Sequence, residues 1–265
     1  MSVVVERAIP FAEKEGWRFL EMDVYRPADQ DGPLPLLHYI HGGGWRRSSR
    51  QRAPREAREW TPSFFEQMVD AGFVVAASDY RFSGEALYPA AIEDTIDAVR
   101  WLRDNADRFG IDATRVVLFG QSGGGYLALA AGLSREIDPV RGVVAWYPLT
   151  DFSALADDDP ASTFPSLWLG GALNTLPDLV ERARLPRLAQ ADAPPILLQH
   201  GTADTMAPFD QSVRMHAALA EAGARVELDR FEGAEHFFVG CDDTQVRALF
   251  ARAMQFARSC VTADP

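Results

Sequence analysis

The chain has 265 residues, a formal net charge of −12, and 47% hydrophobic against 24% charged residues. Such a length and composition fit one globular domain with a large core, and the acidic balance argues against nucleic acid or an anionic membrane as a partner. Two cysteines cannot build a disulfide framework, and neither a signal peptide nor an apolar run of about 18 residues is present. We therefore expect a cytoplasmic protein, and the sequence leaves its oligomeric state open, a homodimer included.

The first part of the chain alternates strand-like and turn-like segments. Residues 19–26 predict a strand and residues 29–33 a turn, which together favour an initial antiparallel hairpin. A second strand, residues 36–40, runs into the glycine-rich stretch 41–45. A helix is predicted to begin near Trp60, with Thr61 as its N-cap and Pro62 at its first position.

From there to the end, short apolar runs alternate with amphipathic segments. The predicted strands and helices are, in order, strand 73–77, a helix opened by Pro89, strand 116–119, a helix after Gly125, strand 140–147, strand 195–200, helix 209–222, strand 225–231 and helix 242–258. This alternation predicts an α/β fold with a mostly parallel sheet and helices on both faces. We expect a single domain over residues 1–265, with residues 149–192 as a cap insertion that covers the site.

The pattern G-x-S-x-G stands between a predicted strand and a predicted helix, with Gly120, Ser122 and Gly124 at its fixed positions. A serine on so tight a turn leaves no room for side chains two positions to either side. A glycine-rich turn that cradles phosphate at a helix N-terminus is the alternative. The strand before and the helix after favour a nucleophilic Ser122.

A nucleophilic serine needs a base and a carboxylate that orients the base. His236 lies in a short loop between the last strand and the last helix, from which its imidazole can reach the serine. The other histidines are assigned to the core, the glycine loop or helix packing: His38, His41, His200 and His216. Asp204 follows a strand and fits the order serine, aspartate, histidine, whereas Asp151, after the preceding strand, is the rival.

A tetrahedral intermediate carries negative charge on an oxygen, which requires donors already aimed at it. The backbone N–H groups of Gly43, Gly44 and Gly123 are the predicted oxyanion hole, the last of them at a helix N-terminus. No cysteine–histidine spacing suggests a metal site, and no cofactor is expected.

With these motifs the chain resembles the α/β-hydrolase superfamily, and within it the short bacterial carboxylesterases with an HGGG loop, related to the hormone-sensitive-lipase-like and feruloyl-esterase-like groups. The resemblance runs from residue 17 to 258 and rests on residues 41–45, 79–81 and 120–125 and on the loops of Asp204 and His236. It implies a serine hydrolase that cleaves small carboxylic esters through an acyl-enzyme intermediate. An arylformamidase-type amide hydrolase and a non-catalytic ligand-binding member of the fold are the alternatives.

Two further groups of residues bear on the substrate. Trp45, Phe164 and Trp168 are candidates to line its pocket, and packing inside the cap is the alternative. The stretch 41–60 has a net charge of +4 from six arginines and two glutamates. The arginines could bind a substrate carboxylate, pair with acids of the insertion such as Asp151 and the run 157–159, or form a solvated face.

Overall fold

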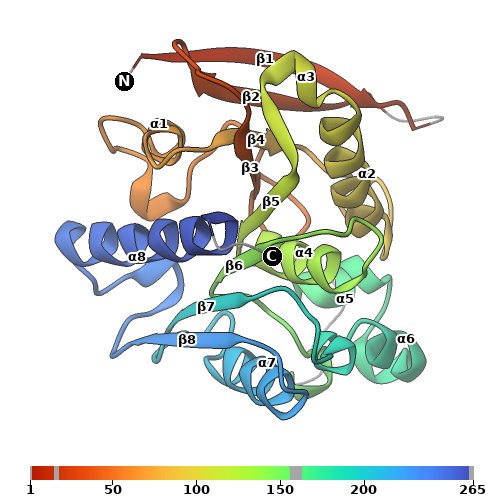
Figure 1. Ribbon diagram of the computed structural model, residues 1–265. Helices are drawn as coiled ribbons and strands as arrows, with labels where there is room; N and C mark the ends of the chain where they lie inside the picture. Colours follow the sequence, from red (N-terminus) through yellow and green to blue (C-terminus); the bar gives the residue numbers. More distant parts are fainter. Residues whose placement is uncertain (1, 15–17, 156–162, 263–265) are drawn as a thin grey trace.

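An eight-stranded sheet in the order β1-β2-β4-β3-β5-β6-β7-β8 forms the centre of the molecule (Figure 1). The computed structural model describes residues 2–14, 18–155 and 163–262. Strand β2 is antiparallel to both β1 and β4, and all the other neighbouring strands are parallel. The strands are β1 (Val3–Ala12), β2 (Leu20–Pro27), β3 (Leu34–Ile40), β4 (Val74–Ser78), β5 (Ile111–Gln121), β6 (Gly142–Trp146), β7 (Ile196–Gly201) and β8 (Val226–Phe231).

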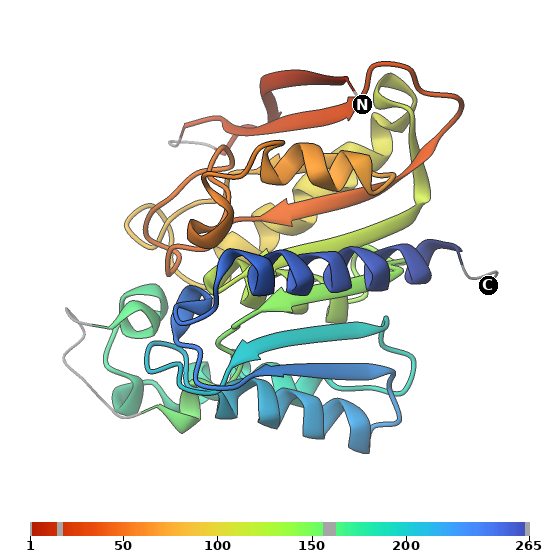
Figure 2. The same ribbon diagram turned by 90° about the vertical axis from the view of Figure 1, so that its left-hand side faces the viewer.

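Helices cover both faces of the sheet because its strands are apolar on both sides. Along β3, Leu37 and Tyr39 join the core under α1 (Phe64–Asp70) and α8 (Asp243–Thr262), while Leu36 joins the core on the other face. Figure 2 shows α8 lying across its face of the sheet. The opposite face is covered by α2 (Ala90–Asp104), α4 (Gly123–Leu133) and α7 (Asp210–Glu221), and α3 (Ala106–Phe109) leads from α2 into β5.

The parallel strands bring distant segments to one edge of the sheet. Strands β3, β5, β7 and β8 all end there, with Ile40 paired to Gly120 and Gly201 to Phe231 in the ladder. The glycine loop, the serine turn and the loops after β7 and β8 therefore start from the same rim. Ligand sites in open α/β sheets lie at this carboxyl edge.

The segment predicted as a cap contains no strand in its described part. It is built from short helices between β6 and β7, and residues 156–162 lie outside the described part of the chain. The short helices are η2 (Phe152–Ala154), α5 (Phe164–Leu169), η3 (Leu173–Thr175), α6 (Pro177–Arg182) and η4 (Leu185–Leu188). Among the described helices, none is both long and apolar enough to cross a membrane.

Three details of the predicted elements were wrong. The turn at residues 29–33 does not form an antiparallel hairpin, because β2 pairs with β1 and β4 and β3 lies beyond β4. The N-cap of α1 is Ser63, because Ser63 and Glu66 form a reciprocal pair. The Glu66 N–H donates to the Ser63 hydroxyl at 3.3 Å, and the Ser63 N–H donates to the Glu66 carboxylate at 2.7 Å. Strand β5 begins at Ile111, five residues before the predicted start, and its first residues pair with Leu34 and Pro35.

Candidate active site

Ser122 stands on a strained turn between β5 and α4. Its backbone has φ 54° and ψ −124°, outside the usual regions for a non-glycine residue. A Cβ at Gly120 would lie 2.8 Å from the Gly125 nitrogen and closer still to the Gly124 carbonyl oxygen. A Cβ at Gly124 would lie 2.5 Å from the His41 carbonyl oxygen. The two outer glycines of the G-x-S-x-G pattern are therefore required by close backbone approach.

Two hydrogen bonds link the Ser122 hydroxyl to the His236 imidazole and the imidazole to the Asp204 carboxylate. His236 Nε2 lies 3.1 Å from Ser122 Oγ, and its Nδ1 lies 2.6 Å from Asp204 Oδ2. A carboxylate only accepts hydrogen bonds, so Nδ1 carries the proton and Nε2 keeps a lone pair directed at the serine hydroxyl. His236 belongs to η5 (His236–Phe238) after β8, and Asp204 to the loop after β7. The structure thus brings together three side chains that the sequence analysis had singled out.

The Asp204 carboxylate is held by four donors. Burial alone would raise the pKa of Asp204, but hydrogen bonds from His200 and His236 outweigh burial and lower this pKa to about 2. The N–H groups of Met206 and Ala207 donate to its Oδ1 at 2.9 and 2.8 Å. Asp204 is consequently ionised and fixed in orientation at neutral pH.

His200 is a supporting residue to which the sequence analysis gave no part in the site. Its Nε2 lies 3.2 Å from Asp204 Oδ2 and 2.8 Å from the Ala207 carbonyl oxygen. Both neighbours accept, so Nε2 is the protonated nitrogen, and Nδ1, 2.7 Å from Ser212 Oγ, accepts from that hydroxyl. The available signal was its position four residues before Asp204 at the end of β7.

The rival carboxylate, Asp151, forms no hydrogen bond or ion pair with His236 and has other partners. It is the N-cap of η2, where its Oδ1 accepts from the Ser153 N–H at 3.1 Å. The Gln211 amide oxygen in turn accepts from the Asp151 N–H at 2.7 Å. Its role in this structure is to order the start of the cap segment.

The glycine loop after β3 lies against the serine turn. Gly43 has φ +111° and Gly44 has φ +60°, a region that side chains rarely adopt. A Cβ at Gly43 would lie 2.9 Å from the Arg47 carbonyl carbon, and a Cβ at Gly44 would lie 2.5 Å from the Phe164 ring. A Cβ at Gly123 would lie 3.4 Å from the Gly44 nitrogen, so the loop and the N-terminus of α4 adjoin. The three glycines predicted as donors line one pocket.

His41 shapes the loop, as predicted for it, and is kept neutral. Burial lowers the pKa of His41 to about 4, and its ring stacks on Tyr80 at 4.4 Å between centroids. Its Nδ1 lies 2.8 Å from the Gly42 carbonyl oxygen, and the Tyr80 hydroxyl donates to the His41 carbonyl oxygen at 3.0 Å.

Two of the three aromatic residues predicted to line the substrate pocket lie elsewhere. Trp45 and Trp168 are fully buried and stack on each other at 4.2 Å, with 9° between their planes. Trp45 Nε1 also donates to the Gly123 carbonyl oxygen at 3.1 Å, so this side chain anchors α4 below the pocket. The packing of large apolar rings against each other keeps both out of the lining. Phe164 alone of the three lines the pocket.

The pocket has a volume of about 920 Å³ and opens over Ser122 and His236. Its apolar lining includes Leu149, Leu155, Phe164, Met206 and Phe237. Four arginines of the stretch 41–60 complete the wall: Arg47, Arg52, Arg55 and Arg58.

The remaining arginines of this stretch do different things. Arg50 is buried and bound to Asp23 at 2.8 Å and Asp79 at 2.5 Å, so it belongs to the scaffold under the loop. Arg46 is exposed and outside the pocket lining. Pairing of the arginines with residues 157–159 concerns a segment outside the described residues, and Asp151 is engaged with Ser153.

Comparison with known proteins gives the class: the protein is a serine carboxylesterase with the α/β-hydrolase fold, as curated relatives and solved structures both indicate. The ethyl acetate hydrolase of Pseudomonas putida is 32% identical in an alignment of 238 positions that covers 83% of this chain and 71% of the relative. The carboxylesterase NlhH of Mycobacterium tuberculosis is 29% identical over 257 residues, covering 89% and 75%. The BD-FAE family model matches residues 22–219, and the chain belongs to this family.

Two solved structures extend the likeness to the whole fold. A truncated carbohydrate esterase from gut microbiota superposes with a TM-score of 0.84 at 26% identity and covers 98% of this chain and 97% of its own. Esterase 2 of Thermogutta terrifontis, in a form phosphorylated by paraoxon, has a TM-score of 0.75 at 25% identity, with coverages of 98% and 96%.

Proposed function

We propose that Ser122, His236 and Asp204 form the catalytic triad of this carboxylesterase, and that Gly43, Gly44 and Gly123 form its oxyanion hole. The observation that carries the proposal is the pair of hydrogen bonds at 3.1 and 2.6 Å that link the three side chains. The same three groups, with this connectivity, define acyl-transfer sites on several unrelated folds.

Acylation follows from the protonation states. Ser122 Oγ attacks the ester carbonyl carbon as His236 Nε2 takes the hydroxyl proton, and the carbonyl electron pair moves onto oxygen. The backbone N–H groups of Gly43, Gly44 and Gly123 donate to that oxyanion. One such donor typically lowers the activation barrier by about 3–4 kcal/mol. Asp204 stays ionised and stabilises the imidazolium.

Collapse of this intermediate breaks the bond to the alcohol oxygen, which leaves with the proton from His236 Nε2. Water then attacks the acyl-Ser122 carbonyl and gives a proton to the same nitrogen. The second intermediate collapses as Nε2 returns this proton to Ser122 Oγ, which releases the carboxylic acid and the free serine. The scheme consumes one ester and one water and needs no cofactor.

We propose small acyl groups as the substrates. Phe164 and neighbouring residues of the cap segment line the pocket, and the ethyl acetate hydrolase relative acts, by its name, on a two-carbon acyl group. A panel of p-nitrophenyl esters graded by acyl length, with N-formylkynurenine included, measures this preference. We expect the acetate and butyrate to be cleaved fastest. A preference for long chains would contradict the proposal, and faster cleavage of N-formylkynurenine would favour an amide hydrolase.

The triad is tested with a fluorophosphonate label, which reacts with an activated serine. We expect labelling at Ser122 and its loss in Ser122→Ala, together with a fall in turnover of about 10⁶-fold. Ser49 also lines the pocket, so Ser49→Ala is the matched control and should still be labelled. A label on Ser49, or an unlabelled native protein, would refute the assignment.

A further inference from the structure

The charged side chains that line the pocket over Ser122 are all arginines. Arg47, Arg52, Arg55 and Arg58 line it and are exposed, while no aspartate or glutamate is among its described lining residues. In a chain with a net charge of −12, four cations collected around one cavity oppose the overall field.

These four guanidinium groups lack a carboxylate partner in the described part of the chain. Within the described ranges none of them forms an ion pair with a carboxylate, whereas Arg50, from the same stretch, binds Asp23, Asp79 and Glu21.

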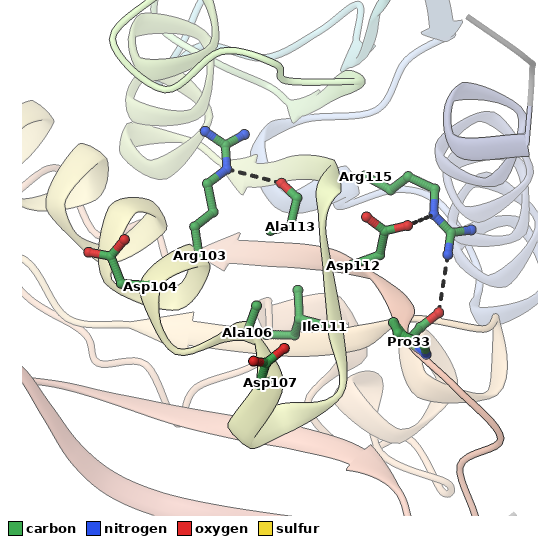
Figure 3. A pocket seen from close by; sticks show the side chains of 9 residues that line it. All are labelled: Pro33, Arg103, Asp104, Ala106, Asp107, Ile111, Asp112, Ala113 and Arg115. Atoms are coloured by element: carbon green, nitrogen blue, oxygen red, sulfur yellow. Dashed lines mark hydrogen bonds and ion pairs between the residues drawn. The ribbon is translucent and has the colours of Figure 1, made fainter.

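A hollow at the opposite end of β5 provides the contrast (Figure 3). There Arg103 donates to the Ala113 carbonyl oxygen at 3.2 Å, and Arg115 donates to Asp112 at 2.6 Å and to the Pro33 carbonyl oxygen at 3.1 Å. The arginines of that hollow are satisfied by the chain itself. Among the residues that the structure describes, no acceptor takes a hydrogen bond from the guanidinium groups around Ser122.

Two of the four lie over aromatic rings of the pocket. The guanidinium of Arg47 lies over the Phe164 ring at 5.8 Å from its centroid, and that of Arg55 lies over the Phe237 ring at 6.0 Å. Both rings line the pocket. A guanidinium beside a ring still has N–H groups to donate, and their fork matches the two oxygens of a carboxylate.

Glu56 lies within the electrostatic reach of Arg55 and Arg58 but forms no ion pair with either. Glu56 lies between Arg55 and Ala57 in η1 (Arg55–Ala57), and its carboxyl accepts from the Tyr147 hydroxyl at 2.5 Å. Asp204 is occupied by the two histidines and two backbone donors. Neither residue lines the pocket.

We infer that the substrate of this site is an ester that also carries a carboxylate, which the pocket arginines bind while Ser122 attacks the ester carbonyl. The inference rests on the proposed function and specifies its substrate class. The carboxylate can belong to the acyl part, as in a half-ester of a dicarboxylic acid, or to the alcohol part, as in an acylated hydroxy acid. Both present the same anionic group to the arginines.

Two matched substrate pairs separate charge from size. Monoethyl glutarate and ethyl pentanoate differ by a carboxylate on the acyl side, and 4-acetoxybutanoate and butyl acetate differ by one on the alcohol side. The released acid is titrated at constant pH, and kcat/KM is compared at about 0.02 and about 0.5 M NaCl. We expect one anionic ester to be preferred over its neutral partner by at least about tenfold at low salt, with the preference shrinking at high salt.

Variants then assign the effect to the pocket. Arg47→Gln, Arg52→Gln, Arg55→Gln and Arg58→Gln are measured singly and combined, and we expect the combination to abolish the anionic preference. Arg46→Gln is the matched control, because it removes one charge from the same stretch outside the pocket lining, and it should leave the ratio unchanged. Urea unfolding of each variant reports whether the fold is affected.

The outcomes are distinct. Neutral esters preferred in both pairs, an equal effect of Arg46→Gln, or pocket variants that lose stability without changing the ratio would each overturn the inference. If the native protein is not labelled by fluorophosphonate at Ser122, the triad itself is overturned. The two failures can therefore be told apart.

Discussion

Adding one methyl group at two adjacent glycines tests how the serine turn is built. A Cβ at Gly124 would lie 2.5 Å from the His41 carbonyl oxygen and closer to that of Ile40, where ordinary contact begins at 3.4 Å. The nearest atom to a Cβ at Gly123 is Trp45 Cε2 at 3.3 Å, so there a shift of about 0.1 Å suffices. Gly124→Ala therefore places its Cβ in a sterically forbidden position, whereas Gly123→Ala places its Cβ in an allowed one.

The expected sizes differ accordingly. Gly124→Ala requires the packed backbone at the end of β3 to move by about 1 Å, and overpacking of this kind costs about 1–3 kcal/mol or more. A displacement of that size at a reacting group lowers the rate by about 10²-fold. Gly123→Ala exchanges glycine for a better helix former at the start of α4, a gain of up to about 1 kcal/mol that offsets the tight contact.

Urea unfolding and p-nitrophenyl acetate hydrolysis measure both effects. We expect Gly123→Ala to stay within about 1 kcal/mol of the native stability and within about tenfold of its kcat/KM, and Gly124→Ala to fail both limits. A Gly124→Ala protein as stable and active as the native one would refute the steric account of the turn. Equal damage from the two substitutions would refute it as well.

Three further substitutions probe the loop, the carboxylate and a buried acid. Gly43→Val should lower kcat by about 10²-fold or more, because a side chain at φ +111° clashes with the Arg47 backbone and displaces the predicted oxyanion donors; p-nitrophenyl acetate turnover measures it. Asp204→Asn should lower kcat by roughly 10⁴-fold through loss of the imidazole tautomer, with Asp151→Asn as the control that retains activity. Burial raises the pKa of Glu56 from 4.5 to about 7, so between these pH values the native chain holds a proton that the unfolded chain has released. The free energy of unfolding should therefore fall by about 3 kcal/mol as pH rises through this window, and Glu56→Gln should remove that slope in urea titrations; an unchanged slope would contradict the cause assigned to it.

Local rules of the backbone made much of the architecture predictable from sequence. Apolar runs bounded by glycine and proline marked most strands, and their alternation with helices was enough to predict a mostly parallel sheet. Such a sheet brings its carboxyl ends to one edge, so the loops of Ser122, Asp204 and His236 could be expected to meet. The need for glycine around Ser122 was also predictable from local rules, because a tight turn excludes side chains whatever surrounds it.

Only the tertiary structure decided whether a given residue packs in the core, supports the site or faces the pocket. Trp45 and Trp168 could have faced substrate or each other, and stacking between them buried both. His200 gained its role because the chain turns back after β7 and places Asp204 against its imidazole. Arg50 and Arg47 lie three residues apart, yet one is bound in a buried network and the other faces the pocket. These outcomes depend on partners that are distant in the chain, since packing and charge pairing act through space, whereas turn and strand preferences act within a few residues.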